Sequence, residues 1–396
     1  MTTSRRRPIR PIGRVATASA LAVCCVLSAC GVTGNGPGTG ATSSATPTPT
    51  QVGPSTDLTV LRGVNVYDLP WYADYPKTWD GEPQSSYDFL AEHGLKLVRM
   101  PFMWPSLQPT LGGPFNQTFV SELTEQVQRA GNAGLSVILD LHNDCQFPNL
   151  DPNHTDPDTV ECGSGISMQD LDDVWLGLSK LFNGNKAVIG YDIMNEPNGV
   201  STATWEAYSQ SVVTTLRDAG DDTLLWIEGA AWSQTSTWVA TEPKPWINDP
   251  ANNFMYSAHQ YFVPDPTYPQ GYDYTAYTQF DQNALSWLES FVDWLLQYGV
   301  RGSIGEVGWP SAKETPATWQ QWNALAEQWY EIADRAKLWV TYFSATSVYD
   351  EPEDAYDAPT NSDGCGPDPN ADPACKPPGI SVAESQSLVI EAHPSF

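Results

Sequence analysis

Basic side chains are scarce in this chain. Its 396 residues include 19 lysines and arginines against 47 aspartates and glutamates, which gives a formal net charge of −28. Such an acidic surface repels the phosphates of nucleic acids, so we expect no nucleic-acid partner and an uncharged substrate. The exception is the first 29 positions, which hold no acidic residue and five arginines: Arg5, Arg6, Arg7, Arg10 and Arg14.

Long apolar runs are also rare, and the clearest one follows those arginines. It extends from about Val15 to Ala29, too short for a permanent membrane span but suited to the core of a signal peptide over residues 1–29. The run ends in Leu27-Ser-Ala-Cys30-Gly31, which resembles the lipobox of bacterial lipoproteins. We therefore expect a lipid on Cys30 and an extracellular protein tethered to the outer face of the cell membrane. An ordinary secretory signal, cleaved nearby, is the alternative.

The segment after the signal contains almost no apolar residues. Residues 30–56 are mainly Gly, Ser, Thr and Pro, a composition typical of flexible tethers. We therefore expect the folded part of the chain to occupy residues 57–396.

Cysteine is infrequent too, with seven in the chain. Once the signal and the lipidated position are set aside, Cys145, Cys162, Cys365 and Cys375 remain for an oxidising compartment. They allow three connectivities, of which the pairs 145–162 and 365–375 are the simplest. Because no Cys-x-x-Cys spacing occurs, a zinc site is the weaker alternative.

From Leu58 onward, apolar segments of strand type alternate with segments of helical period. Eight strands are predicted, at 59–67, 96–104, 136–142, 188–196, 224–229, 254–261, 302–306 and 340–346. Helices are predicted between most of them, at 121–133, 171–182, 204–219, 284–298 and 318–336. Glycines at 94, 134, 220 and 299 follow helical segments, where they relieve a left-handed C-cap.

Strands that are apolar throughout indicate a parallel sheet covered on both faces. An open doubly wound sheet is disfavoured because Arg62-Gly-Val-Asn-Val-Tyr67 offers no Gly-rich phosphate turn. The pattern therefore predicts a single (β/α)8 barrel. We expect a long loop at about 350–378, carrying the second cysteine pair, and a closing helix at about 382–392.

Polar side chains cluster where the predicted strands end, the place where such barrels gather their chemistry. They are Arg99, His142, Asn143, Asn195, Glu196, His259, Tyr261, Glu306 and Trp309. Glu196 and Glu306 each follow an apolar segment directly. Cleavage of a glycosidic bond requires one carboxylic acid and one carboxylate at a fixed separation. The alternative is that two surface glutamates merely end their strands.

Five short motifs, in this order along the chain, resemble glycoside hydrolase family 5. They are Val98-Arg-Met-Pro101, Asp140-Leu-His-Asn143, Met194-Asn-Glu-Pro197, His259-Gln-Tyr261 and Ile304-Gly-Glu-Val-Gly308. The resemblance spans about residues 58–350. It implies a retaining glycosidase on a (β/α)8 barrel, with no metal and no cofactor.

The resemblance also implies roles for individual residues. Glu196 would be the general acid/base, its pKa raised by the charge of the nucleophile Glu306. Asn195 would donate to the sugar 2-hydroxyl. Arg99 would keep Glu306 ionised, and Tyr261 would donate a hydrogen bond to it. His142 and His259, with Asn143 of the same motif as His142, would line the sugar subsite.

Aromatic residues are plentiful and suit a polysaccharide cleft, because sugar rings stack on flat aromatic faces. Candidate platforms at or after strand ends are Trp71, Trp79, Trp104, Trp232 and, most of all, Trp309. One departure concerns the eighth strand, which in this family usually ends with a tryptophan below the −1 sugar. Here Phe343 stands near that place, or the register is displaced.

The sequence thus predicts a secreted, membrane-tethered retaining β-glycosidase, acting as a monomer on a polysaccharide, with an endo-β-1,4-glucanase favoured. A β-mannanase or an exo-acting relative is the enzymatic alternative. A non-catalytic carbohydrate-binding lipoprotein and a metal-dependent deacetylase or esterase are alternatives from other classes. Two further hypotheses are a metal site at His142, Asp144 and His154 and a calcium site at Asp350–Asp354, and both are less favoured than a site without metal.

Overall fold

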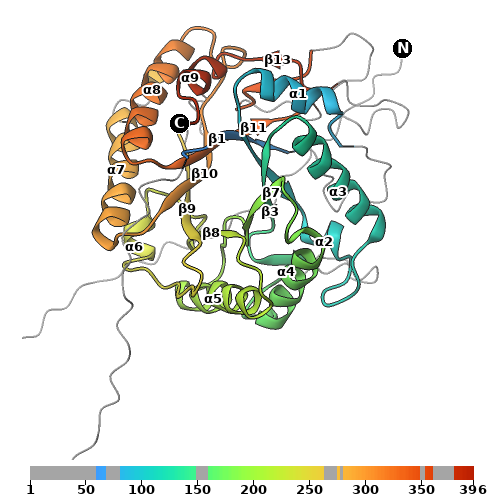
Figure 1. Ribbon diagram of the computed structural model, residues 1–396. Coiled ribbons are helices and arrows are strands. Elements are labelled where there is room, and N and C mark those ends of the chain that lie inside the picture. Colours follow the sequence, from blue (N-terminus) through green and yellow to red (C-terminus); the bar gives the residue numbers. More distant parts are fainter. Residues whose placement is uncertain are drawn as a thin grey trace, which may run out of the picture. The chain divides into compact units, whose positions relative to one another are not determined.

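A closed barrel of parallel strands forms the centre of the computed structural model, which describes residues 59–67, 81–148, 159–262, 274–276, 280–347, 353–359 and 379–396 (Figure 1). Each strand pairs with the next in chain order, and β1 pairs with β11 to close the ring. The barrel strands are β1 (Arg62–Val66), β2 (Leu97–Phe102), β3 (Ser136–Leu141), β7 (Val188–Asp192), β8 (Leu224–Glu228), β9 (Phe254–Tyr261), β10 (Gly302–Gly308) and β11 (Trp339–Ala345). The predicted (β/α)8 barrel is confirmed.

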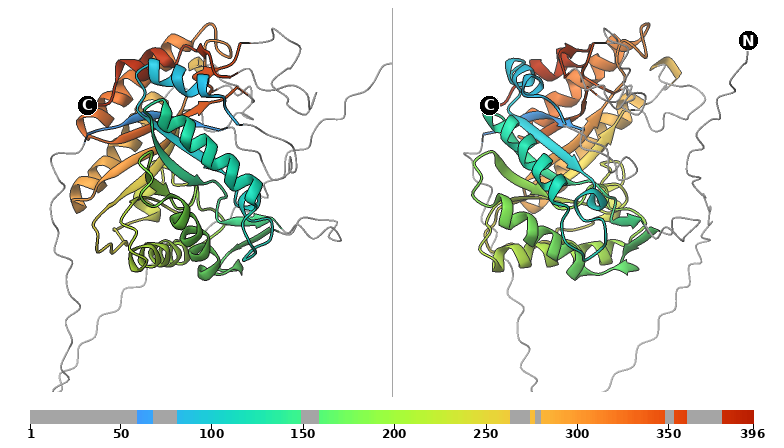
Figure 2. Two further views of the ribbon diagram at one scale, coloured as in Figure 1. Left: turned by 45° about the vertical axis from the view of Figure 1, so that its right-hand side comes forward. Right: turned by 90° about the vertical axis from the view of Figure 1, so that its right-hand side faces the viewer.

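Helices surround the barrel, as the views along and across its axis show (Figures 1 and 2). Those described are α1 (Gln84–Glu92), α2 (Trp104–Leu107), α3 (Gln117–Asn132), α4 (Met168–Phe182), α5 (Thr202–Asp218), α6 (Trp238–Thr241), α7 (Phe280–Tyr298), α8 (Trp319–Arg335) and α9 (Ser387–Ala392), with a 3-10 turn η2 (Tyr274–Ala276). None of the helices in the described ranges is long and apolar enough to cross a bilayer.

Local capping explains where several helices begin and end. Ser167 and Asp170 form a reciprocal capping box at the start of α4, and Asn116 accepts backbone N–H bonds at the start of α3. The glycines predicted to follow helices, at 94, 134, 220 and 299, all have φ between 64° and 84°. Their missing Cβ makes this left-handed backbone inexpensive.

The inside of the barrel has two layers of different character. Side chains at the N-terminal ends of the strands form an apolar layer made of Val60, Leu97, Ile138, Leu224, Trp226, Met255 and Trp339. Two residues further along β2, β3 and β8, on the same face, lie Arg99, Asp140 and Glu228, all with no exposed surface. Each of these three strands is therefore largely apolar in sequence and still places one charged side chain inside the barrel, nearer the C-terminal ends of the strands.

Small additions decorate the barrel. After β3 lies a three-stranded sheet of β4 (Gln146–Pro148), β5 (Thr159–Cys162) and β6 (Gly165–Ile166), which the sequence did not predict. Cys145 and Cys162 are joined by a disulfide with 5.5 Å between their Cα atoms, which confirms that predicted pair.

The C-terminal region differs in part from its prediction. The last helix begins at Ser387, not near 382, because Val382–Ala383 instead forms β13, which pairs with β12 (Tyr356–Asp357). The predictions for residues 1–56, including Cys30, and for Cys365 and Cys375 lie outside the described residues, as do Trp71, Trp79, His154 and Asp350.

Candidate active site

Glu196 sits at the end of the segment that continues β7, with its backbone in an unusual conformation. Its φ is 44°, in the left-handed region that a glutamate rarely adopts. Its backbone N–H donates to the Glu228 carboxylate over 2.6 Å, and the N–H of its neighbour Asn195 donates to the Leu141 carbonyl over 2.9 Å. Such a conformation costs about 1–3 kcal/mol and persists only where the surroundings impose it.

Glu306 lies within β10, where the pairing with β9 shifts register between Ile304 and Glu306, and it is 3% exposed. Arg99 donates to one carboxylate oxygen over 2.8 Å, and the Tyr261 hydroxyl donates to the other over 2.5 Å. Burial alone would favour the neutral acid, but His259, Arg99 and His142 outweigh it and, with the Tyr261 bond, lower the pKa to about 2. Glu306 is therefore a carboxylate, with both predicted partners in place.

Glu196 has the opposite electrostatic character. Burial raises its pKa to about 7, and the charges of Glu306 and Glu228 add to this, while the bond from His259 acts against it. The predicted direction is confirmed, but its main cause is removal from water, and the charge of Glu306 is a smaller contribution. A carboxyl of this kind is protonated in about half of the molecules at neutral pH, and the protonated form can deliver its proton.

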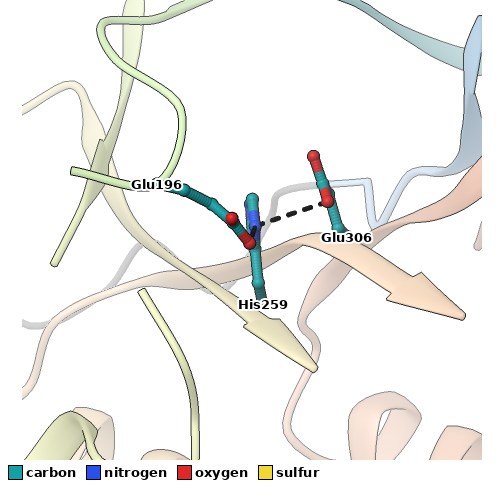
Figure 3. Close-up of side chains that lie close together, drawn as sticks. All are labelled: Glu196, His259 and Glu306. Carbon is teal, nitrogen blue, oxygen red and sulfur yellow. Dashed lines mark hydrogen bonds and ion pairs between the residues drawn. The ribbon is translucent and has the colours of Figure 1, made fainter. Parts of the chain in front are cut away.

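His259 of β9 stands between the two glutamates (Figure 3). Its Nδ1 lies 2.9 Å from Glu196 Oε1 and 3.6 Å from Glu306 Oε2, while Nε2 lies 2.9 Å from Glu228 Oε1. Burial would lower its pKa, but Glu228 and Glu306 raise it well above the usual value. Gly305 leaves room for this ring, since a Cβ there would lie 2.7 Å from Nε2.

Arg99 is fully buried at the centre of a ring of acceptors. Its guanidinium contacts the carboxylates of Asp140, Asp192, Glu228 and Glu306 at distances between 2.8 and 3.1 Å, together with the side-chain oxygens of Asn65 and Asn195 at 2.9 Å. Burial would lower its pKa, and the four carboxylates raise it. Arg99 was predicted to keep Glu306 in its charged form, and its position fits that task, while its lack of exposed surface leaves no contact for a sugar.

His142 and Asn195 lie side by side at the rim of the site. The Asp140 carboxylate lies 2.8 Å from His142 Nδ1 and, despite burial, raises the pKa of this histidine. Asn195 accepts from Arg99, so its amide nitrogen points the other way, 3.3 Å from Asp144 and 3.4 Å from His142 Nε2. That nitrogen is the donor predicted for the sugar 2-hydroxyl.

Two predicted sugar-binding residues have structural roles. Trp309 is fully buried, stacks on Phe262 and donates from its indole to Asn323, so the prediction that it presents a face to a sugar is wrong. Asn143 accepts the backbone N–H of Trp104 and donates to the Gln146 carbonyl, which commits both ends of its amide to the loop. Both residues were predicted to bind sugar because they lie close in sequence to strand ends that carry candidate site residues, and this proximity was misleading.

Other aromatic candidates divide into buried and accessible ones. Trp104 is fully buried, whereas Trp232 is partly exposed. The backbone N–H of Trp232 donates to the Pro197 carbonyl over 3.4 Å. Phe343 is partly exposed, with its ring 6.2 Å from that of Tyr261 and 5.4 Å from that of Tyr67. Phe343 therefore lies beside Tyr261, the residue that donates a hydrogen bond to Glu306.

Sequence reasoning missed four buried residues of this site, which are Asn65, Asp140, Asp192 and Glu228. Each contacts Arg99. Glu228 was detectable in principle, because it ends the strand Leu224-Leu-Trp-Ile-Glu228 just as the recognised residues end theirs. The others sit inside or beside apolar runs, where one polar residue gives little signal.

A (β/α)8 barrel with two convergent glutamates at its strand ends is typical of glycoside hydrolases. The profile described as cellulase, glycosyl hydrolase family 5, matches residues 50–348. The chain therefore belongs to that family.

Curated relatives cover only part of the chain. The manganese dependent endoglucanase Eg5A of Phanerodontia chrysosporium is 32% identical over 58% of this chain and 60% of its own length. Endoglucanase EG-II of Hypocrea jecorina is 26% identical over 48% of this chain and 44% of its own. The chain thus spans about half the length of these relatives.

Solved structures support the fold. Endoglucanase Cel5A of Pseudomonas stutzeri superposes with a TM-score of 0.67 at 22% identity, covering 85% of this chain and 94% of that one. XacCel5A in complex with cellopentaose gives a TM-score of 0.63 at 23% identity, covering 84% and 99%.

The name of the fungal relative raises the question of a metal. Within the described ranges, one group of three possible ligands lies within 4.8 Å of one another, and it consists of Glu196, His259 and Glu306. A metal-bound histidine must be neutral, but both nitrogens of His259 face carboxylates that favour its protonated form. These residues do not fit a resident metal ion.

Proposed function

We propose that this protein is a retaining β-glycosidase, an endo-acting β-1,4-glucanase, with Glu196 as acid/base and Glu306 as nucleophile. The supporting observation is a pair of carboxyl groups, one just beyond β7 and one on β10, that approach within 4.8 Å and have opposite pKa shifts. Retaining glycosidases hold their carboxyls about 5–5.5 Å apart, whereas inverting ones leave room for a water at about 6.5–9.5 Å.

In the first step, Glu306 attacks the anomeric carbon while the bond from that carbon to the glycosidic oxygen breaks. Glu196 gives its proton to the departing oxygen, so the leaving chain departs as a neutral alcohol. Arg99 and Tyr261 hold Glu306 in position through its two oxygens, which keeps the attacking oxygen oriented.

In the second step, water attacks the anomeric carbon of the glycosyl ester and gives a proton to Glu196, while the bond from that carbon to Glu306 breaks and Glu306 leaves as a carboxylate. Glu306 carries no charge in the ester, so one of the contributions that raise the pKa of Glu196 disappears there. Glu196 is thus a better acid before the ester forms and a better base afterwards. Burial, the larger contribution, stays, so the pKa falls only part of the way.

The choice of a β-1,4-glucan as substrate is supported by the family and by the relatives, whose names describe endoglucanases. Purified protein should release reducing ends from carboxymethyl cellulose or barley β-glucan faster than from mannan or xylan, with a rapid fall in viscosity. Preference for mannan, or release of single sugars without a fall in viscosity, would identify the alternative specificities. Binding without release of sugar from any glycan would refute the enzymatic proposal.

We also propose that the protein acts outside the cell, as a monomer tethered through a lipid on Cys30. The support is the N-terminal sequence, in which arginines, an apolar run and Leu27-Ser-Ala-Cys30 follow one another. The full-length protein should partition into detergent, and Cys30→Ala should move it to the aqueous phase. A Cys30→Ala protein that stays with the membrane would contradict this anchor.

A further inference from the structure

Glu228, at the end of β8, takes no part in the two steps above, yet it is fully buried and contacts three residues of the site. One of its oxygens lies 2.9 Å from His259 Nε2 and 3.1 Å from the Arg99 guanidinium. The other accepts the backbone N–H of Glu196 over 2.6 Å. Glu228 is therefore linked to both proposed catalytic glutamates, to Glu196 directly and to Glu306 through the two cations.

The backbone around Glu228 is fixed from both sides. The Trp205 indole donates to the Glu228 carbonyl over 2.7 Å, and the Gly229 N–H donates to the Ser233 hydroxyl over 2.9 Å. Ala231, Trp232 and Ser233 all have φ between 53° and 60°, three consecutive left-handed residues without a glycine. Because such a turn persists only when its surroundings impose it, the position of the Glu228 carboxylate is well determined.

We propose that Glu228 is a positioning residue that holds Glu196 in its left-handed conformation and keeps the proton on His259. Glu228 acts through other residues and does not touch the sugar. The contacts separate its two tasks, because one oxygen serves the backbone of Glu196 and the other serves the ring of His259.

The second task determines how both glutamates titrate. Apart from burial, which opposes it, Glu228 is the largest influence on His259 and raises its pKa. His259 in turn is the largest influence that lowers the pKa of Glu306, and its bond and charge lower the pKa of Glu196 more than the charge of Glu228 raises it. If the charge of Glu228 is removed, the pKa of His259 falls, and at any pH where His259 then loses its proton the pKa values of both glutamates rise.

Glu228→Gln tests this, because it removes the charge but keeps an oxygen to accept the Glu196 N–H. We expect both limbs of the pH profile of kcat/KM to move to higher pH, with kcat lowered about 10- to 100-fold, as for loss of a charge-assisted hydrogen bond. KM should change little. Glu228→Asp, which keeps the charge but shortens the reach, should lower kcat while the limbs stay closer to those of the wild type.

Glu242→Gln is the matched control. Glu242 is also fully buried and bonds the same turn by accepting the Ala230 N–H over 2.9 Å, but none of its described contacts is with His259. Its substitution should leave both limbs in place. If Glu228→Gln lowers activity or thermal stability but leaves the limbs unmoved, Glu228 is only structural and the proposal fails.

A measurement on the wild-type protein does not depend on activity and needs a variant only to assign one signal. Nitrogen NMR of labelled histidine, with His259 assigned by its loss in His259→Gln, should show both ring nitrogens protonated at pH 8. A neutral ring there would overturn the proposal even if the enzyme proves to be an endoglucanase. Only the kinetic test depends on the proposed function, so the two failures are distinguishable.

Discussion

The ends of β7 and β10 carry the same side chain in two chemical states. Glu196 lies beyond the end of its strand, on a left-handed backbone, and its pKa is about 7. Glu306 lies within its strand, beside a register shift, and its pKa is about 2. Both are largely removed from water, so burial is not what separates them.

The difference comes from how the cations are shared. Glu306 receives Arg99 on one oxygen and Tyr261 on the other, with His259 and His142 nearby, whereas His259 is the cation that contacts Glu196. A barrel can thus set two glutamates to different tasks by gathering its cations around one of them, here His259, Arg99 and His142 around Glu306. Experiments that treat the two strand ends differently test this comparison directly.

The largest effect is expected when the carboxylate on β10, that of Glu306, is removed. Glu306→Ala deletes the nucleophile, so no glycosyl ester can form on any substrate, and kcat should fall by about 10⁵-fold or more, as for loss of other covalent nucleophiles. Reducing-sugar release with and without azide measures this. Azide or formate, entering the space that the side chain leaves, should restore slow turnover with inverted configuration. Rescue with retained configuration would show that Glu306 is not the nucleophile.

Removing the carboxyl group beyond β7, that of Glu196, should have a smaller effect on the rate, and the size of this effect should depend on the leaving group. Glu196→Ala should lower kcat on oligosaccharides about 10²- to 10⁴-fold, the range for loss of general acid catalysis. On dinitrophenyl glycosides the first step should persist, because that leaving group needs no proton, and glycosyl-enzyme should accumulate. Azide should then yield a β-glycosyl azide of retained configuration. Equal behaviour of Glu196→Ala and Glu306→Ala with azide would end the distinction between the two strand ends.

The pH dependence of wild-type activity should show the ionisation of both glutamates in one experiment. Activity requires Glu306 ionised and Glu196 protonated in the free enzyme, so kcat/KM should rise through the low pKa of Glu306 and fall above about pH 7. Initial rates on a soluble cello-oligosaccharide between about pH 1 and 9, a range that extends beyond both pKa values, would record this, because each limb changes the rate about tenfold per pH unit. A descending limb well below pH 6 would contradict the assignment of Glu196.

Tyr261→Phe should move one limb more than the other. The hydroxyl of Tyr261 donates to Glu306, so its loss should raise the pKa of Glu306 and shift the acidic limb upward. A hydrogen bond to a charged group contributes about 1.5–3 kcal/mol, so kcat/KM should fall about 10- to 100-fold. The alkaline limb, set by Glu196, should stay near its original position. An equal shift of both limbs would mean that Tyr261 does not distinguish the two carboxyls.

Sequence reasoning found the two glutamates because each ends a strong apolar run, and strand ends converge at one face of a barrel. Through the family resemblance it also named Arg99 and Tyr261 as partners of Glu306, but it missed the carboxylates that surround Arg99 and His259. Asp192 and Glu228 reach Arg99 only after the barrel closes, and such contacts across the barrel leave no local pattern. For the same reason Trp309, next to the nucleophile strand in sequence, faces the core, packed against Phe262 and Tyr342.

The smallest effect should come from the disulfide, which stabilises the backbone near Glu196 and does not contact the strand that carries Glu306. Cys145 follows Asp144, whose N–H donates to the Asn195 carbonyl over 3.1 Å and whose carbonyl accepts the Asn198 N–H over 3.2 Å. Reduction should therefore loosen the backbone that flanks Glu196. Closing a loop with a sequence separation of 17 contributes roughly 3 kcal/mol in the chain-entropy model, which a domain of this size should survive.

Cys145→Ala with Cys162→Ala makes this measurable without reductant. The double variant should melt several degrees lower yet fold, and its rate on cello-oligosaccharides, which need the proton from Glu196, should fall by a few fold. Its rate on dinitrophenyl glycosides should hardly change, because Glu306 and its partners belong to strands that the bridge does not touch. Equal losses on both substrates would show that the bridge supports the whole barrel and not the acid side in particular.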